Sequence, residues 1–153
     1  MAVPIITISV PGEPIAQPRP RVFRSKSGKA MAVSSASRRI KTWRERIILA
    51  AQQQYDGPPL DGPLYLEVTF RLPRPKRLMR KRDPEGDVPC DKRPDLDNLL
   101  KAIKDGLGSV LWRDDSQVAR VDATKVYHSK NGKPGAIIKV RGYKARANLR
   151  LPV

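Results

Sequence analysis

Residues 64–72 read LYLEVTFRL, and apolar and polar or amphipathic side chains alternate along them. Every second residue is apolar, namely Leu64, Leu66, Val68, Phe70 and Leu72. Because successive side chains of a β-strand point to opposite faces, this pattern puts one apolar row on a single face. The stretch therefore predicts a half-buried β-strand.

A helix is expected on each side of this strand along the chain. From Ile40 to Ala51, apolar residues recur near a period of 3.6, which predicts a helix that follows the serines at 34–37 and runs to Tyr55. The stretch 96–107 (LDNLLKAIKDGL) shows the same period and ends at glycines.

Three more strands are expected. Residues 3–10 (VPIITISV) are rich in β-branched side chains, residues 118–127 alternate loosely, and residues 136–140 (AIIKV) follow an Asn-Gly hairpin signal. The order is strand, helix, strand, helix, strand, strand. It predicts one α+β domain over residues 1–153, with a mixed four-stranded sheet and two helices.

Two segments show no periodicity. Residues 73–94 are rich in proline and basic side chains, and we expect them to form a long mobile loop. Residues 142–153 are interpreted as a basic C-terminal tail.

The 153-residue chain is strongly basic, with 31 Lys and Arg against 15 Asp and Glu and a net charge of +16. Such a charge indicates a polyanionic partner, most often a nucleic acid. No apolar run approaches the roughly 20 residues that a membrane span needs. The one cysteine excludes a disulfide scaffold and points to the cytoplasm, and the one histidine excludes a multi-histidine metal site.

The acidic residues are concentrated, because ten of the fifteen lie between Asp83 and Asp122. In the flanking segments 19–46 and 125–150, almost all of the charged residues are basic. Carboxylates repel phosphate, so an acidic centre in a phosphate-binding chain needs a reason. A divalent cation supplies one, since it bridges carboxylate and phosphate.

Two short acidic motifs are the candidate site. Asp95 and Asp97 lie two apart at the start of the second predicted helix, where both carboxylates can share one cation. Asp114 and Asp115 follow that helix, and a chain that returns can bring a third carboxylate to the first two. Lys101 lies four residues after Asp97 on the same helix face. Together they fit Mg²⁺-assisted phosphodiester hydrolysis.

Simpler interpretations stay open at this point. An aspartate at a helix start commonly caps the helix. Asp97 and Lys101 are also spaced as an ordinary surface pair, and Asp114-Asp115-Ser116 is also typical of a turn.

The stretch 93–101 (RPDLDNLLK), followed by 112–118 (WRDDSQV), resembles the RusA-type Holliday junction resolvases. The resemblance implies a homodimer that binds four-way DNA junctions and cuts two opposed strands with Mg²⁺, for which Mn²⁺ can substitute. The family's catalytic and metal-binding aspartates correspond to Asp95, Asp97 and Asp115, and its essential lysine corresponds to Lys101.

Such an enzyme also needs to hold the DNA backbone, and we expect a role in recombination and repair in a bacterial or phage-encoded, cytoplasmic protein. The candidate DNA-binding residues are Arg19, Arg21, Arg24, Arg74, Lys76, Arg77 and Arg93. Two alternatives are a non-enzymatic basic nucleic-acid-binding protein and a nuclease that acts on other branched DNA such as flaps.

Overall fold

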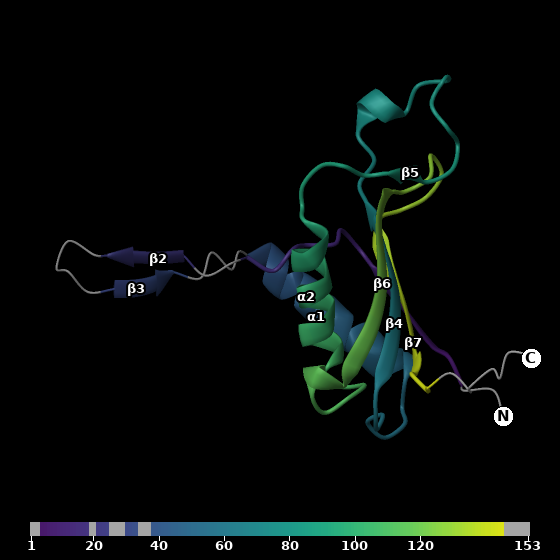
Figure 1. The fold of residues 1–153 in the computed structure, drawn as a ribbon. Helices are drawn as coiled ribbons and strands as arrows, with labels where there is room; N and C mark the ends of the chain where they lie inside the picture. The colour runs from purple at the N-terminus through teal and green to yellow at the C-terminus, as the bar shows by residue number, and fades with distance from the viewer. Residues whose placement is uncertain (1–3, 19–20, 25–29, 34–37, 146–153) are drawn as a thin grey trace, which may run out of the picture.

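The computed structural model describes residues 4–18, 21–24, 30–33 and 38–145. A mixed five-stranded sheet is covered by two helices, which confirms the α+β class (Figure 1). Along the chain, the main elements are β1 (Ile6–Pro11), α1 (Arg38–Gln54), β4 (Leu64–Leu72), β5 (Val88–Pro89), α2 (Leu96–Leu107), β6 (Val118–Tyr127) and β7 (Gly135–Gly142). The strand order across the sheet is β1-β7-β4-β6-β5.

Strand β4 lies at the centre of the sheet, between β7 and β6. It pairs antiparallel with β7 and parallel with β6. A parallel pair needs a long crossover connection, and α2 lies in that connection. The alternation in 64–72 is confirmed, since all five apolar residues of the row are buried.

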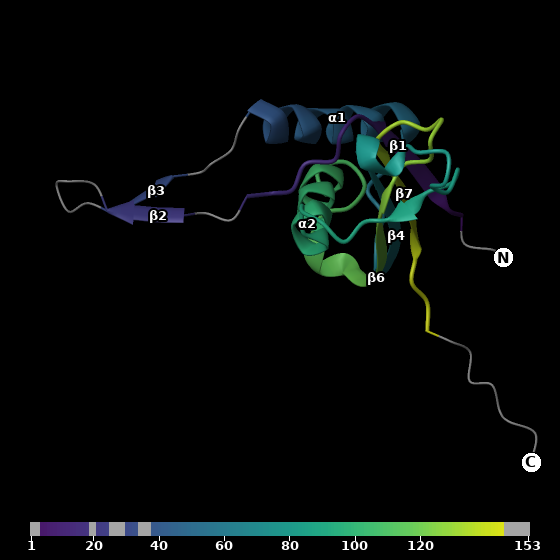
Figure 2. The same cartoon turned by 90° about the horizontal axis from the view of Figure 1, so that it is seen from above.

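Helices α1 and α2 both pack on one face of the sheet (Figure 2). Their apolar stripes meet the sheet in a single core that includes Trp43, Ile47 and Ile103. The helices also touch each other closely. A Cβ on Gly106 would lie 2.5 Å from Cγ2 of Ile47, so only glycine fits at this position of α2.

The predicted count of four strands was too low by one in this sheet. The additional strand, β5, has two residues and pairs antiparallel with the end of β6. Two residues are too few to produce a periodic pattern, which is why the sequence gives no signal for β5.

A second pairing that the sequence analysis did not predict is the antiparallel hairpin of β2 (Arg21–Arg24) and β3 (Ala30–Val33). It forms a separate two-stranded sheet that stands apart from the domain body (Figures 1 and 2). Each strand has four residues, too few for a clear alternation.

The predicted loop 73–94 is built around Arg74. Arg74 is 8% exposed, and its guanidinium donates to the backbone carbonyls of Leu78, Gly86 and Pro84 at 2.9, 2.9 and 2.6 Å. These contacts give Arg74 a structural role in the loop and argue against its predicted role in DNA binding, which stays a prediction. The mobility of the loop stays a prediction.

The loop also contains a short 3-10 helix, η1 (Lys76–Leu78), near its outer end. At the C-terminus, β7 ends at Gly142, and most of the predicted basic tail lies outside the described residues. Among the helices of the described ranges, none is long and apolar enough to span a bilayer.

Candidate active site

The first acidic motif lies at the N-terminal end of α2. Asp95 occupies the N-cap position with extended backbone angles (φ −70°, ψ 140°), and its exposed side chain makes no capping hydrogen bond. Helix capping therefore does not explain this aspartate.

Asp97 lies in the first turn of α2 and is exposed. Its Oδ1 accepts a hydrogen bond of 2.9 Å from the backbone N–H of Asn98. Lys101 is also exposed and follows one turn later on the same face of the helix. The structure therefore groups Asp95, Asp97 and Lys101 along the first two turns of α2.

The second acidic motif lies in η2 (Asp115–Gln117), directly before β6. Asp114 caps this turn, because its Oδ1 accepts from the N–H of Ser116 at 2.8 Å. The backbone hydrogen bond from Ser116 lowers the pKa of Asp114 below its ordinary value. The side chain of Gln117 completes a capping box. Asp114 thus has a structural role, as its turn-like sequence allowed.

Asp115 is held by a core tryptophan. The indole Nε1–H of Trp112 donates to Oδ1 of Asp115 at 2.9 Å, while the Trp112 side chain is 2% exposed. A Cβ on Gly108 would lie 2.8 Å from this oxygen and 2.9 Å from Nε1 of Trp112. Gly108 therefore leaves room for the contact. Trp112 was not among the predicted functional residues. The spacing of three residues to Asp115 was the available signal.

The two motifs lie at opposite ends of α2. Asp95 precedes the helix, whereas Asp115 packs beside Gly108, the residue that follows its last turn. A 12-residue helix is about 18 Å long. No group of three possible metal-ligating side chains occurs within the described ranges.

The expectation that the returning chain brings Asp115 to Asp95 and Asp97 is therefore not met within one chain. The physical reason is the position of Asp115 in the crossover. It comes directly after α2, before β6 begins its return along the sheet. Two carboxylates alone still match Mg²⁺, which commonly takes one or two protein carboxylates and completes its shell with water and phosphate oxygens.

A polar groove lies beside Asp115. Arg44 and Arg113 line it together with the carboxylates of Asp105 and Asp114. The Nη2 of Arg44 donates to Oε1 of Gln17 at 2.9 Å. The backbone N–H of Gln17 in turn donates to the carbonyl of Asn98 at 3.0 Å. Arg44 on α1 is thereby linked to the first turn of α2.

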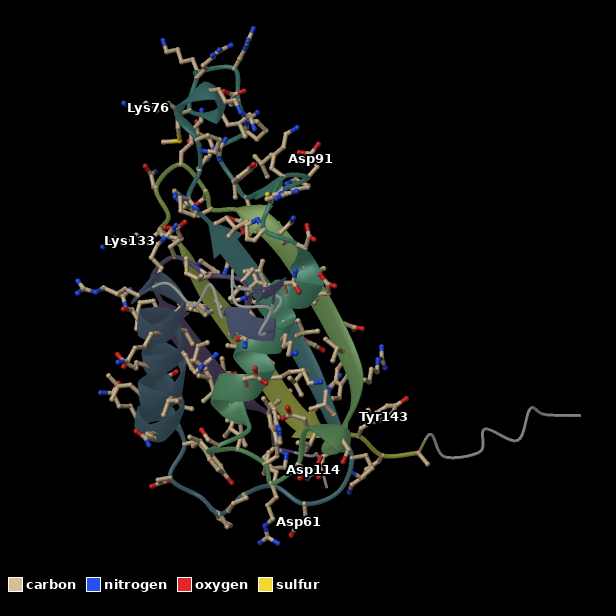
Figure 3. The ribbon with its side chains drawn as sticks, turned by 90° about the vertical axis from the view of Figure 1, so that its left-hand side faces the viewer. Asp61, Lys76, Asp91, Asp114, Lys133 and Tyr143 are labelled. Atoms are coloured by element: carbon tan, nitrogen blue, oxygen red, sulfur yellow. The ribbon has the colours of Figure 1, made fainter. Side chains whose placement is uncertain are left out.

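The remaining predicted DNA-binding residues are dispersed. Lys76 and Arg77 are exposed on η1, and Arg93 is exposed two residues before Asp95. Figure 3 shows Lys76 and Asp114 near opposite ends of the molecule. Arg19 and the side chains of Arg21 and Arg24 lie outside the described part of the structure.

Two exposed carboxylates, those of Asp95 and Asp97, thus lie at the start of a helix in a basic α+β domain, and a nuclease can use such an arrangement. The family model of the endodeoxyribonuclease RusA matches residues 11–141. The chain belongs to the RusA endodeoxyribonuclease family, and this membership supports a nuclease activity.

Two bacterial relatives match most of the chain. The chain is 31% identical over 127 residues to the uncharacterized protein YqaN of Bacillus subtilis, covering 80% of this chain and 87% of the relative. It is 27% identical over 126 residues to the crossover junction endodeoxyribonuclease RusA of Aquifex aeolicus, covering 82% of each chain. A cytoplasmic location stays a prediction.

Proposed function

We propose that this chain is a metal-dependent, structure-selective endodeoxyribonuclease that resolves four-way DNA junctions in recombination and repair. The observation that carries the proposal is the exposed Asp95 carboxylate, which is not used as a helix cap and lies two residues before Asp97. Family membership supports the nuclease, and the name of the Aquifex relative supports the junction as substrate.

Mg²⁺ is the proposed cofactor, with Mn²⁺ as a substitute. Asp95 and Asp97 would hold it, because carboxylates are the hard oxygen ligands that Mg²⁺ takes in proteins and both are exposed at the start of α2. When bound, the ion supplies Lewis-acid chemistry toward a phosphate oxygen.

Lys101 has a separate role in this proposal. Its ammonium group follows Asp97 by one helical turn and is exposed to an incoming phosphate. A fixed positive charge at this place stabilises the negative charge that develops on the phosphate during strand cleavage.

We also propose that the enzyme acts as a homodimer. If Asp115 contributes to the same reaction as Asp95 and Asp97, it must come from a second copy, since one chain keeps the two motifs at opposite ends of α2. Two helices α2 packed antiparallel around a two-fold axis would place each N-terminal pair beside the partner copy's Asp115. Two symmetric sites also suit two symmetric cuts.

DNA binding rests on the net charge of +16 and on exposed basic side chains such as Lys76, Arg77 and Arg93. Contacts of this kind release counterions from DNA, so the affinity should fall steeply as salt rises.

The test compares wild type and Asp97→Asn on a synthetic four-way junction, a flap and linear duplex, with and without Mg²⁺. We expect the wild type to cut the junction with Mg²⁺ only, and Asp97→Asn to bind the junction without cutting it. Binding without cleavage by the wild type would favour a non-enzymatic binding protein. Preferential cleavage of flaps would favour a nuclease for other branched DNA, and equal cleavage of linear duplex would remove the structure selectivity.

A further inference from the structure

Lys125 lies near the end of β6, on the side of the sheet that the helices cover. In the parallel pairing with β4 it stands beside Phe70, which is fully buried in the core. Neighbouring residues in register share a face, so the Lys125 side chain extends from the edge of the core rather than from the open face of the sheet. It is half-buried.

The Lys125 ammonium group contacts the chain that leads into Asp95. Its Nζ donates to the carbonyl of Lys92 at 2.6 Å and to the carbonyl of Pro94 at 2.8 Å. The backbone carbonyl of Lys125 also accepts from the N–H of Cys90 at 3.2 Å. One residue of β6 thus holds the segment 90–94 at three points.

These contacts end one residue before the proposed metal ligand. Hydrogen bonds from an ammonium group are charge-assisted and stronger than neutral ones, so they restrain the carbonyls of Lys92 and Pro94 tightly. Pro94 is joined directly to Asp95, which has no capping hydrogen bond of its own to fix its side chain. Although the chain is strongly basic, the ammonium group of Lys125 is directed at backbone carbonyls of the same chain rather than at solvent.

We propose that Lys125 is a positioning residue of the active site: it holds the segment 92–94 and thereby fixes the Asp95 carboxylate for metal binding. This inference rests on the proposed function. Groups that orient a metal ligand commonly change metal affinity or activity by about 10- to 100-fold when removed. Lys125 itself touches neither the phosphate nor the metal.

The test measures Mn²⁺ binding to the purified full-length protein by electron paramagnetic resonance, alongside the Mg²⁺ dependence of junction cleavage. Lys125→Met keeps the length of the side chain and removes its three donors. We expect Mn²⁺ affinity to fall about 10-fold or more and the Mg²⁺ concentration for half-maximal cleavage to rise by a similar factor. Junction binding in the presence of a chelator should be unchanged.

Lys130→Met is the matched control. Lys130 also donates to a carbonyl of the 73–94 loop, that of Arg80 at 2.7 Å, but 15 residues along the chain from Asp95. Its replacement should leave Mn²⁺ affinity unchanged. Lys125→Arg retains charged donors and should restore most of the affinity that Lys125→Met loses.

Equal Mn²⁺ affinity in folded Lys125→Met and wild type would overturn the positioning role while leaving the nuclease intact. An equal loss in Lys130→Met would also overturn it, because the effect would then belong to loop stability in general. If Lys125→Met does not fold, Lys125→Gln is measured instead, since its shorter neutral side chain cannot reach both carbonyls, and unchanged affinity there overturns the proposal. A wild type that neither binds Mn²⁺ nor cuts junctions would instead refute the proposed function.

Discussion

The two ends of helix α2 carry the same type of residue in two different settings. At the N-terminal end, Asp95 is exposed and caps no amide of the helix. Beyond the C-terminal end, Asp114 caps a turn and Asp115 accepts the indole N–H of Trp112. The contrast teaches that local structure accounts for Asp114 fully, for Asp115 in part, and for Asp95 not at all. An aspartate without a local role is the better candidate for chemistry.

The largest effect is expected at the N-terminal end. Asp95→Asn should reduce Mg²⁺-dependent junction cleavage by about 100-fold or more, because it removes a charged oxygen ligand. The thermal unfolding midpoint should hardly change, since the side chain caps nothing. Cleavage assays and thermal denaturation of the same preparation check both statements, and cleavage at the wild-type rate would remove Asp95 from the site.

The next effect concerns the orientation of Asp115. Trp112→Phe keeps most of the buried ring and loses the hydrogen bond to Asp115, so we expect cleavage to fall about 10-fold. The free energy of unfolding should fall by about 1 kcal/mol because the hydrogen bond to Asp115 is lost. The smaller ring of phenylalanine should lower it further.

Trp43→Phe is the matched control for Trp112→Phe. Trp43 is equally buried, at 2%, and its Nε1 has no hydrogen-bond partner among the described residues. Its replacement should cost packing stability but leave the cleavage rate per folded molecule unchanged. A comparable loss of cleavage in both variants would mean that core packing, and not the contact with Asp115, sets the rate.

A smaller effect is expected on DNA binding, where exposed basic side chains should contribute more than basic side chains that already form ion pairs. Replacing Lys76 and Arg77 together by alanine should weaken junction binding and lower the slope of log affinity against log salt by about 2, if each contacts one phosphate. Arg120 and Arg141 are paired with Asp122 and Glu67 at 3.5 and 3.4 Å.

Replacing Arg120 and Arg141 together by alanine is the control for that measurement. Because their charges are already matched on the open face of the sheet, the salt slope should stay near the wild-type value. Filter binding or fluorescence anisotropy over a series of salt concentrations distinguishes the two pairs. Equal changes in slope would place the open face of the sheet against DNA as well.

The smallest expected effect is the pH dependence contributed by Asp114. Its pKa is lowered in the folded state by the Ser116 hydrogen bonds, so its stabilising contribution is present above the ordinary value of 3.8 and disappears as the pH falls through the folded pKa. Wild type should therefore be slightly more stable than Asp114→Asn at pH 6, and this difference in the free energy of unfolding should be smaller at pH 3, which lies below the ordinary pKa of 3.8. Urea denaturation at both pH values checks this, and a constant difference would contradict the assignment.

Long periodic segments made most of the fold predictable. The alternation from Leu64 to Leu72 predicted strand β4, and the apolar stripe of residues 96–107 predicted helix α2. Each segment is long enough for its pattern to repeat several times. The hairpin β2–β3 and the strand β5 could not be predicted in this way. Their strands have four and two residues, and their pairing depends on tertiary contacts rather than on local pattern.

The site was predictable in its residues but not in its geometry. Sequence spacing and the family resemblance selected Asp95, Asp97, Lys101 and Asp115, whose roles stay predictions. Neither could show that α2 separates Asp115 from the others. The spacing of residues in a motif does not specify where the chain that follows a helix lies in space. The burial of Arg74 and the contacts of Lys125 likewise depend on how the loop 73–94 folds and packs against the end of β6, which the sequence pattern does not indicate.

The central claim is that both ends of α2 serve one reaction through two copies of the chain. The most direct measurement is junction cleavage by Asp97→Asn and Asp115→Asn, each alone and co-expressed with different tags so that mixed dimers can be isolated. Each single variant should be inactive, whereas the mixed dimer should regain cleavage of one strand per junction, because one of its two sites is complete. A mixed dimer as inactive as its parents, or a single variant with wild-type activity, would contradict the claim.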